Sequence, residues 1–91
     1  MKTICIKAII TGKVQGVFYR DNTRQQAEML GITGWVKNNN DDTVELHACG
    51  EKTKIQLLID WLHKGPTRAE VTQVNWVEIP IENYEQFSII R

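Results

Sequence analysis

The segment from Gly12 to Arg20 holds the first candidate for chemistry, because two glycines and an arginine stand where a strand pattern gives way to a helix pattern. Successive backbone N–H groups in such a turn form a concave nest for an anion, and the positive end of the helix dipole reinforces it. Gly12 and Gly16 lack a Cβ, so the backbone can turn tightly and approach a ligand closely. The guanidinium of Arg20, in the first helical turn, can close on the same anion with two hydrogen bonds.

The glycines do not make this loop a nucleotide-binding P-loop, because no Gly-Lys-Ser or Gly-Lys-Thr ending is present. Two glycines and one arginine are also compatible with an ordinary strand-to-helix turn that carries a solvent-exposed arginine. The spacing alone therefore leaves an anion site and a structural turn as open interpretations.

Seven segments with a regular hydrophobic pattern must position this loop. Strand-like alternation and helix-like stripes follow one another in the order β-α-β-β-α-β-β. They cover residues 4–10, 20–30, 32–38, 43–50, 52–64, 71–79 and 84–90. The run Asn-Asn-Asn-Asp-Asp at residues 38–42 predicts a hairpin turn, and Gly31 and Gly65-Pro66 predict the two helix ends.

Two helices of similar length on one face of a sheet predict a split β-α-β, ferredoxin-like α+β sandwich. In that arrangement the first strand pairs antiparallel with the third, the central strand order is 4-1-3-2, and the short last strand adds at an edge. There is no internal repeat, linker or low-complexity tract. We expect one domain over residues 1–91.

The composition excludes several classes of protein. The chain has 91 residues, 42% of them hydrophobic, with 11 basic and 11 acidic side chains and a net charge of zero. Such a balance argues against disorder and against binding of nucleic acid by bulk electrostatics. The sequence has no apolar run of about 18 residues, so we expect no membrane-spanning helix. The first ten residues superficially resemble a secretion signal, but Lys7 interrupts their apolar region and no small-residue cleavage site follows, so we expect a cytoplasmic protein.

The sequence letters of the loop carry more information than its spacing. The acylphosphatase family has a signature, G-[RK]-V-Q-G-V-x-[FY]-R, which closely resembles the run GKVQGVFYR at residues 12–20. Its second signature, G-[WY]-[VA]-x-N, is similar to GWVKN at residues 34–38. The resemblance covers essentially the whole chain, and the family's fold is the same ferredoxin-like sandwich.

This resemblance implies hydrolysis of acyl phosphates to a carboxylate and inorganic phosphate. By the same resemblance, Arg20 and the backbone N–H groups of Gln15, Gly16, Val17, Phe18, Tyr19 and Arg20 would bind the phosphoryl group. Asn38 would hold the attacking water, and Thr43 would support the geometry of the asparagine. The implied partners are a small-molecule acyl phosphate and inorganic phosphate as product and inhibitor, with no nucleic acid or membrane. We expect a monomer.

Elementary chemistry agrees with this assignment. The leaving carboxylate has a conjugate acid with a pKa near 4 (about the value of Asp or Glu), so no general acid is required. Phosphoryl transfer through a loose transition state needs positioning and charge stabilisation more than a strong base. We therefore expect no cofactor and no metal.

Two residues put details of the resemblance in question. Asp42 stands where the family usually has glycine before the threonine of the hairpin, but aspartate tolerates the left-handed region, so we expect the turn to survive. Asp21 follows Arg20 directly and could pair with an arginine. Because adjacent helical residues face different ways, we expect a solvated carboxylate instead.

Cys5 and Cys49 belong to no catalytic motif. We expect both on the more exposed face of the sheet, on neighbouring strands, where a disulfide is geometrically possible and free thiols are the default in a reducing cytoplasm. His47 and His63 have no spaced ligand partners, so no metal site is expected.

Two other functions suit the predicted fold. An RNA-binding module of the RRM type would need paired aromatic side chains on the central strands and a basic sheet face. A non-catalytic sensor would use the anion nest alone.

Overall fold

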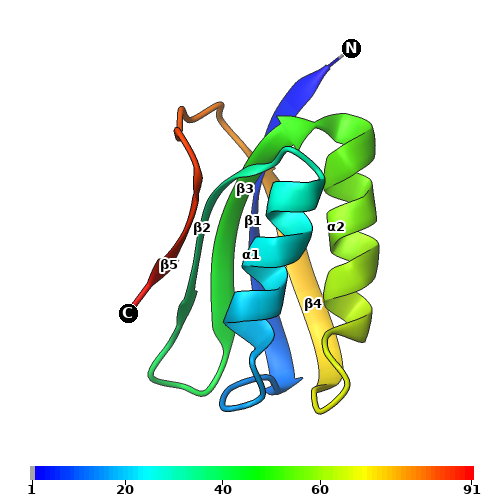
Figure 1. The fold of residues 1–91 in the computed structure, drawn as a ribbon, viewed down its shortest axis with the longest axis vertical. Helices are drawn as coiled ribbons and strands as arrows, with labels where there is room; N and C mark the ends of the chain where they lie inside the picture. The colour runs from blue at the N-terminus through cyan, green and yellow to red at the C-terminus, as the bar shows by residue number, and fades with distance from the viewer. Residues whose placement is uncertain (1) are drawn as a thin grey trace.

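The computed structural model describes residues 2–91 and shows two helices packed on one face of a five-stranded sheet (Figure 1). The strands are β1 (Thr3–Lys13), β2 (Thr33–Asn38), β3 (Val44–Glu51), β4 (Glu70–Ile79) and β5 (Phe87–Ile90); the helices are α1 (Tyr19–Met29) and α2 (Lys52–Lys64). This arrangement confirms the predicted ferredoxin-like α+β sandwich.

The sheet has the strand order β4-β1-β3-β2-β5. β1 lies antiparallel between β3 and β4, β2 is antiparallel to β3, and β5 is parallel to β2. The predicted central order and the edge position of the last strand are therefore confirmed. Since β1, β2 and β5 all run in one direction, their C-terminal ends lie at the same end of the sheet.

The hydrophobic core fills the space between the sheet and the two helices. It is built from alternate residues of β1 and from one stripe of α2 with the spacing i, i+3, i+4, i+7. These residues, all at most 4% exposed, are Ile4, Ile6, Ala8 and Ile10 of β1 and Ile55, Leu58, Ile59 and Leu62 of α2. Burial of each large apolar side chain contributes about 1.5–3 kcal/mol. The core thereby fixes the position of β1, which leads into the loop of interest.

Three connections gather at the lower end of the sandwich in Figure 1: the β1–α1 loop, the β2–β3 turn and the α2–β4 loop. In the β2–β3 turn, Asp42 has φ 72°, a left-handed conformation, and its N–H donates to the Asn39 carbonyl at 3.3 Å. The turn keeps its shape with aspartate at this position, as expected. It holds the end of β2 beside the β1–α1 loop.

The last strand is shorter than predicted, because residues 80–86 cross the end of the sheet before β5 begins at Phe87. This crossing segment covers the two cysteines, and the Glu82 N–H lies 3.3 Å from the Cys5 Sγ. Cys5 and Cys49 face each other across β1 and β3 and form a disulfide, with their Cα atoms 4.0 Å apart. The two cysteines lie on the sheet face opposite the helices, as expected, but they are bonded rather than free. They are also buried, with Cys5 0% and Cys49 5% exposed, because the crossing segment covers that face.

Candidate active site

The β1–α1 loop contains left-handed backbone at two alternate positions. Gly16 has φ 72° and Phe18 has φ 64°, whereas Val17 between them is right-handed or extended. Alternation of this kind turns successive N–H groups toward one concave side, which is the geometry of an anion nest. Within residues 2–91, the backbone N–H groups of residues 15–20 donate no hydrogen bond. The loop therefore presents several uncommitted donors at the N-terminus of α1.

Gly12 has a different role from the one the sequence suggested. It belongs to β1, at an irregularity in the pairing with β4, and its φ is 128°. A Cβ at this position would overlap the carbonyl oxygen of Glu70. Glycine is needed here because two strands approach closely, and only Gly16 lies in the loop itself.

Asn38 lies beside the β1–α1 loop because of the direction of β2 and because alternate residues of a strand share one face. Asn38 is the last residue of β2 and shares the helix-facing side of the sheet with Val36, which is fully buried. Arg20 lies in the first turn of α1, which packs over β2. The two residues are 18 positions apart in sequence and line the same cavity.

This cavity has a volume of about 250 Å³. Its lining combines the loop, the start of α1, the end of β2 and the end of the described chain. The lining residues are Val14, Gly16, Phe18, Tyr19, Arg20, Asp21, Asn38 and Arg91. Two arginines and Asn38 thus line the same hollow as the loop with uncommitted backbone donors, and these residue types can together hold a small oxyanion.

Asn38 differs from the other polar residues that line the cavity because one of its side-chain atoms is buried without a hydrogen-bond partner within residues 2–91. Its Oδ1 is buried and has no hydrogen-bond partner among the described residues. A buried acceptor without a partner costs about 1–3 kcal/mol. An amide oxygen held in this condition beside a cavity is suited to accept a hydrogen bond from a bound molecule.

Gln15 contributes a side-chain contact that the sequence did not predict. Its Nε2 donates to the carbonyl oxygens of Asn39 and Thr43, both at 2.9 Å. These bonds tie the β1–α1 loop to the β2–β3 turn.

Thr43 itself accepts a hydrogen bond from the Nδ2 of Asn39 at 3.0 Å and donates one to Asp41. Its side chain therefore contacts the neighbour of Asn38, so any support it gives to Asn38 passes through the turn.

Replacement of Gln15 tests this link between the two loops. Gln15→Ala removes both hydrogen bonds, and we expect the free energy of unfolding to fall by about 1–2 kcal/mol in urea denaturation. Gln15→Glu keeps the shape but places an acceptor against two carbonyl oxygens, so it should destabilise the protein at least as much. The control, Gln25→Glu, makes the same change on the exposed side of α1. Equal effects of the two glutamate substitutions would contradict the proposed tie.

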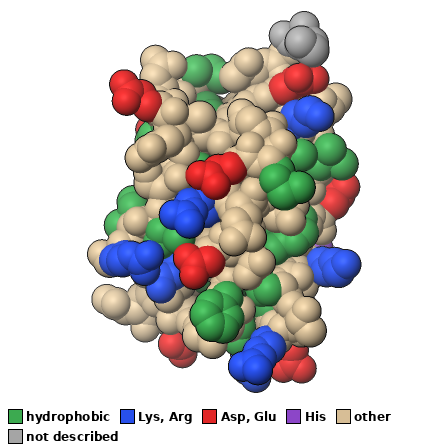
Figure 2. Space-filling view, viewed as in Figure 1, with side chains coloured by type: hydrophobic (Ala, Val, Ile, Leu, Met, Phe, Trp, Pro, Cys, Tyr) green, Lys and Arg blue, Asp and Glu red, His purple; other side chains and the backbone are tan. Residues whose placement is uncertain are grey.

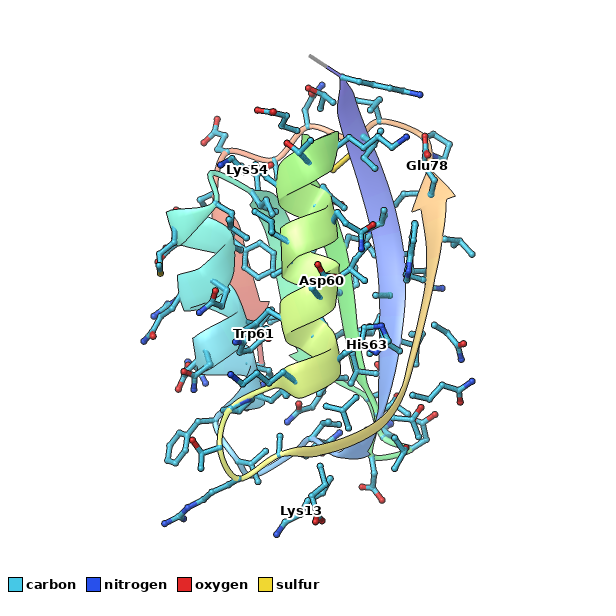
Figure 3. All side chains as sticks on the ribbon, turned by 90° about the vertical axis from the view of Figure 1, so that its right-hand side faces the viewer. Lys13, Lys54, Asp60, Trp61, His63 and Glu78 are labelled. Atoms are coloured by element: carbon cyan, nitrogen blue, oxygen red, sulfur yellow. A yellow bond between two sulfur atoms is a disulfide. The ribbon has the colours of Figure 1, made fainter. Side chains whose placement is uncertain are left out.

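The side chain of Tyr19 is buried in the core, and a hydrogen bond from its hydroxyl group holds it in place. The hydroxyl donates to the carbonyl oxygen of Leu62 at 2.7 Å, near the C-terminal end of α2. In a continuing helix this carbonyl would accept from the residue four positions on, but that residue is Pro66, which has no N–H. Burial raises the pKa of the Tyr19 hydroxyl, which keeps it a donor. The ring also packs on Trp61, with centroids 5.6 Å apart, and Figure 3 shows Trp61 on the side of α2 that faces α1.

Removal of the Tyr19 hydroxyl should destabilise the fold. Tyr19→Phe leaves the Leu62 carbonyl buried without a partner, and we expect a loss of about 1–3 kcal/mol in the free energy of unfolding. The measurement is equilibrium urea denaturation, with the m-value checked for constancy. An unchanged midpoint would show that this hydrogen bond contributes nothing to stability.

The charges at the cavity differ from the sequence expectation in two places. Asp21 is exposed and makes no ion pair within residues 2–91, as expected, but it lines the cavity rather than facing away from it. Arg91 was not identified from the sequence. Lys37 of β2 pairs in parallel with Ile90, the last residue of β5. The residues that follow these two, Asn38 and Arg91, therefore come to the same end of the sheet and line the same cavity.

Other titratable residues lie apart from the cavity. The Oδ1 of Asp41 accepts hydrogen bonds from the hydroxyl and the N–H of Thr43, which lower the pKa of its carboxyl group. His47 stacks on Trp35 and has its Nδ1 3.0 Å from the Oε1 of Glu82, on the open face of the sheet. Within residues 2–91 no cluster of three or more histidine, cysteine, aspartate or glutamate side chains is placed to hold a metal ion. Among the helices of the same range, none has the length and hydrophobicity of a membrane span.

Fold and site together define a ferredoxin-like domain with an arginine- and asparagine-lined cavity at the loop end of its sheet. Residues 6–89 match the acylphosphatase family profile. An acylphosphatase from Coxiella burnetii (strain Dugway 5J108-111) is 52% identical over 85 residues, which are 93% of this chain and 90% of the relative. The chain belongs to the acylphosphatase family.

Solved structures agree with this relationship. The structure of an acylphosphatase from Coxiella burnetii superposes with a TM-score of 0.94 at 49% identity and covers 97% of this chain and 93% of that one. The crystal structure of acylphosphatase from Bacillus subtilis also gives a TM-score of 0.94, at 30% identity, with 97% and 99% of the two chains covered. The relatives support a hydrolase of the acylphosphatase type.

Proposed function

We propose that this chain hydrolyses acyl phosphates, with the phosphoryl group held by Arg20 and the backbone N–H groups of residues 15–20, and with the attacking water oriented by Asn38. The observation that carries the proposal is that Arg20 and Asn38, from different elements, line one cavity beside backbone donors that have no partner among residues 2–91. Membership in the acylphosphatase family gives this arrangement its reaction class.

In the proposed reaction, the oxygen of the water attacks phosphorus while the bond between phosphorus and the carboxyl oxygen breaks. The electron pair of that bond leaves with the carboxylate, and the proton of the water passes to a phosphate oxygen. Negative charge on the equatorial oxygens is stabilised by the guanidinium group of Arg20 and by the loop N–H groups. The unsatisfied Oδ1 of Asn38 accepts a hydrogen bond from the water and aims it at phosphorus.

No metal ion is needed in this scheme. A carboxylate leaves readily at neutral pH, because its conjugate acid has a pKa of about 4. The charge that a metal would neutralise is instead met by arginine and oriented amide groups. We therefore propose metal-independent hydrolysis of a small-molecule substrate by a monomeric cytoplasmic enzyme, with inorganic phosphate as product and as a competitive inhibitor.

The test is hydrolysis of benzoyl phosphate by the purified protein, with and without EDTA. We expect turnover that EDTA does not change and that inorganic phosphate inhibits competitively. Binding of phosphate without turnover would indicate an anion sensor, and salt-dependent binding of RNA without turnover would indicate an RNA-binding module. Either result would overturn the proposed enzyme.

A further inference from the structure

Phe18 occupies the variable position of the first signature, between Val17 and Tyr19. Its two neighbours are buried, at 4% and 1% exposure, whereas Phe18 itself is 67% exposed. Its backbone is also left-handed, with φ 64°. For a bulky residue this conformation is uncommon and costs about 1–3 kcal/mol, and such strain concentrates at ligand sites. An exposed aromatic side chain is thus held at a strained position beside the cavity.

Phe18 separates two hollows on the loop end of the molecule. It lines the cavity that contains Arg20 and Asn38, and it also lines a second hollow of about 300 Å³. The second hollow is formed by Val17, Phe18, Asn22, Pro66, Thr67 and Arg68. The α2–β4 loop supplies three of these residues and reaches the β1–α1 loop at the lower end of the sandwich (Figure 1). Figure 2 shows hydrophobic surface exposed at this end.

We infer that Phe18 and the second hollow form the subsite for the acyl part of the substrate, and that this subsite favours an aromatic acyl group. The inference rests on the proposed function, which places the phosphoryl group in the first cavity. A substrate held there must direct its acyl group outward, and the second hollow adjoins the same side chain. An aromatic acyl group would stack on the ring of Phe18.

The opposite wall of the hollow also suits an aromatic ring. Pro66 offers an apolar surface, and Arg68, which has no ion-pair partner within residues 2–91, can lay its guanidinium group on a ring face. The side-chain amide of Asn22 is already hydrogen-bonded within the protein, because its Nδ2 donates to the Phe18 carbonyl at 2.9 Å. That bond holds the backbone of Phe18 to the first turn of α1. Three of the six lining residues, Val17, Phe18 and Pro66, thus offer apolar surface, and a polar group on the wall is already committed within the protein.

The experiment compares kcat/KM for benzoyl phosphate with kcat/KM for acetyl phosphate in the same preparations. The ratio of the two values is the readout, because any damage to the phosphate-binding backbone affects both substrates and cancels. We expect Phe18→Ala to lower this ratio about tenfold and Phe18→Leu to lower it less, since leucine keeps apolar bulk but cannot stack. Both variants retain a Cβ at the left-handed position. Arg68→Ala, in the opposite wall, should lower the ratio about threefold.

The control is Met29→Ala, which truncates another exposed hydrophobic side chain, 79% exposed at the far end of α1. It should leave the ratio at the wild-type value. If Phe18→Ala and Arg68→Ala leave the ratio unchanged while wild-type protein hydrolyses both substrates, the acyl subsite is wrong and the proposed function stands. If the wild type hydrolyses neither substrate, the proposed function itself fails.

Discussion

Arg20→Ala should lower kcat/KM for benzoyl phosphate by about 10²–10³-fold, the loss that follows removal of one strong donor to a transition-state oxyanion. The same substitution should raise the inhibition constant of inorganic phosphate about tenfold, because the guanidinium group would bind the product as well as the transition state. Steady-state kinetics with phosphate as a competitive inhibitor measure both quantities.

The charge and the shape of Arg20 can be separated. Arg20→Lys keeps a positive charge but loses the planar fork that makes two parallel hydrogen bonds, so we expect activity between those of the wild type and the alanine variant. The matched control is Arg24→Ala, one turn further along α1 and outside the lining of the cavity. A similar loss in the control would show that helix charge, rather than contact with the phosphate, causes the effect.

Asn38→Ala should lower kcat by about 10²–10³-fold and leave the inhibition constant of phosphate nearly unchanged. The reason is that Asn38 is proposed to position the water, whereas the loop and Arg20 are proposed to bind the phosphoryl group. The buried Oδ1 of Asn38 has no hydrogen-bond partner among the described residues, and such a group lowers the stability of the folded protein. The alanine variant removes it and should therefore be at least as stable as the wild type in urea.

The matched control for this variant is Asn40→Ala, an exposed residue of the same turn that does not line the cavity. It should retain wild-type activity. If Asn38→Ala retained kcat but bound phosphate weakly, the amide would be a phosphate ligand and the assignment of the water to Asn38 would be wrong.

The elements of this fold were predictable because their signals are local. The stripe from Ile55 to Leu62, ended by Gly65 and Pro66, predicts α2 with its observed bounds. Alternation along residues 4–10 predicts β1, and the family resemblance of the loop and of Asn38 rests on residue identity at fixed spacing. Strand order followed from the rules by which such elements close a single core.

Contacts between segments distant in sequence were decided by the tertiary structure. Arg91 reaches the cavity because β5 pairs in parallel with β2, and no local pattern encodes that register. The Gln15 side chain links two loops 24 to 28 residues apart, and Gly12 is required by the approach of Glu70. The burial of Cys5 depends on a crossing segment 77 residues away.

The sequence by itself thus determined the class of fold, the family and the residue types that we propose meet an anion. A periodic pattern reports which face of an element is buried, and a motif reports which groups are available. Neither reports which side chains from separate elements share a cavity, because that depends on strand register and on the path of the loops. The exposed Phe18 between two hollows is visible only when the β1–α1 and α2–β4 loops are seen side by side.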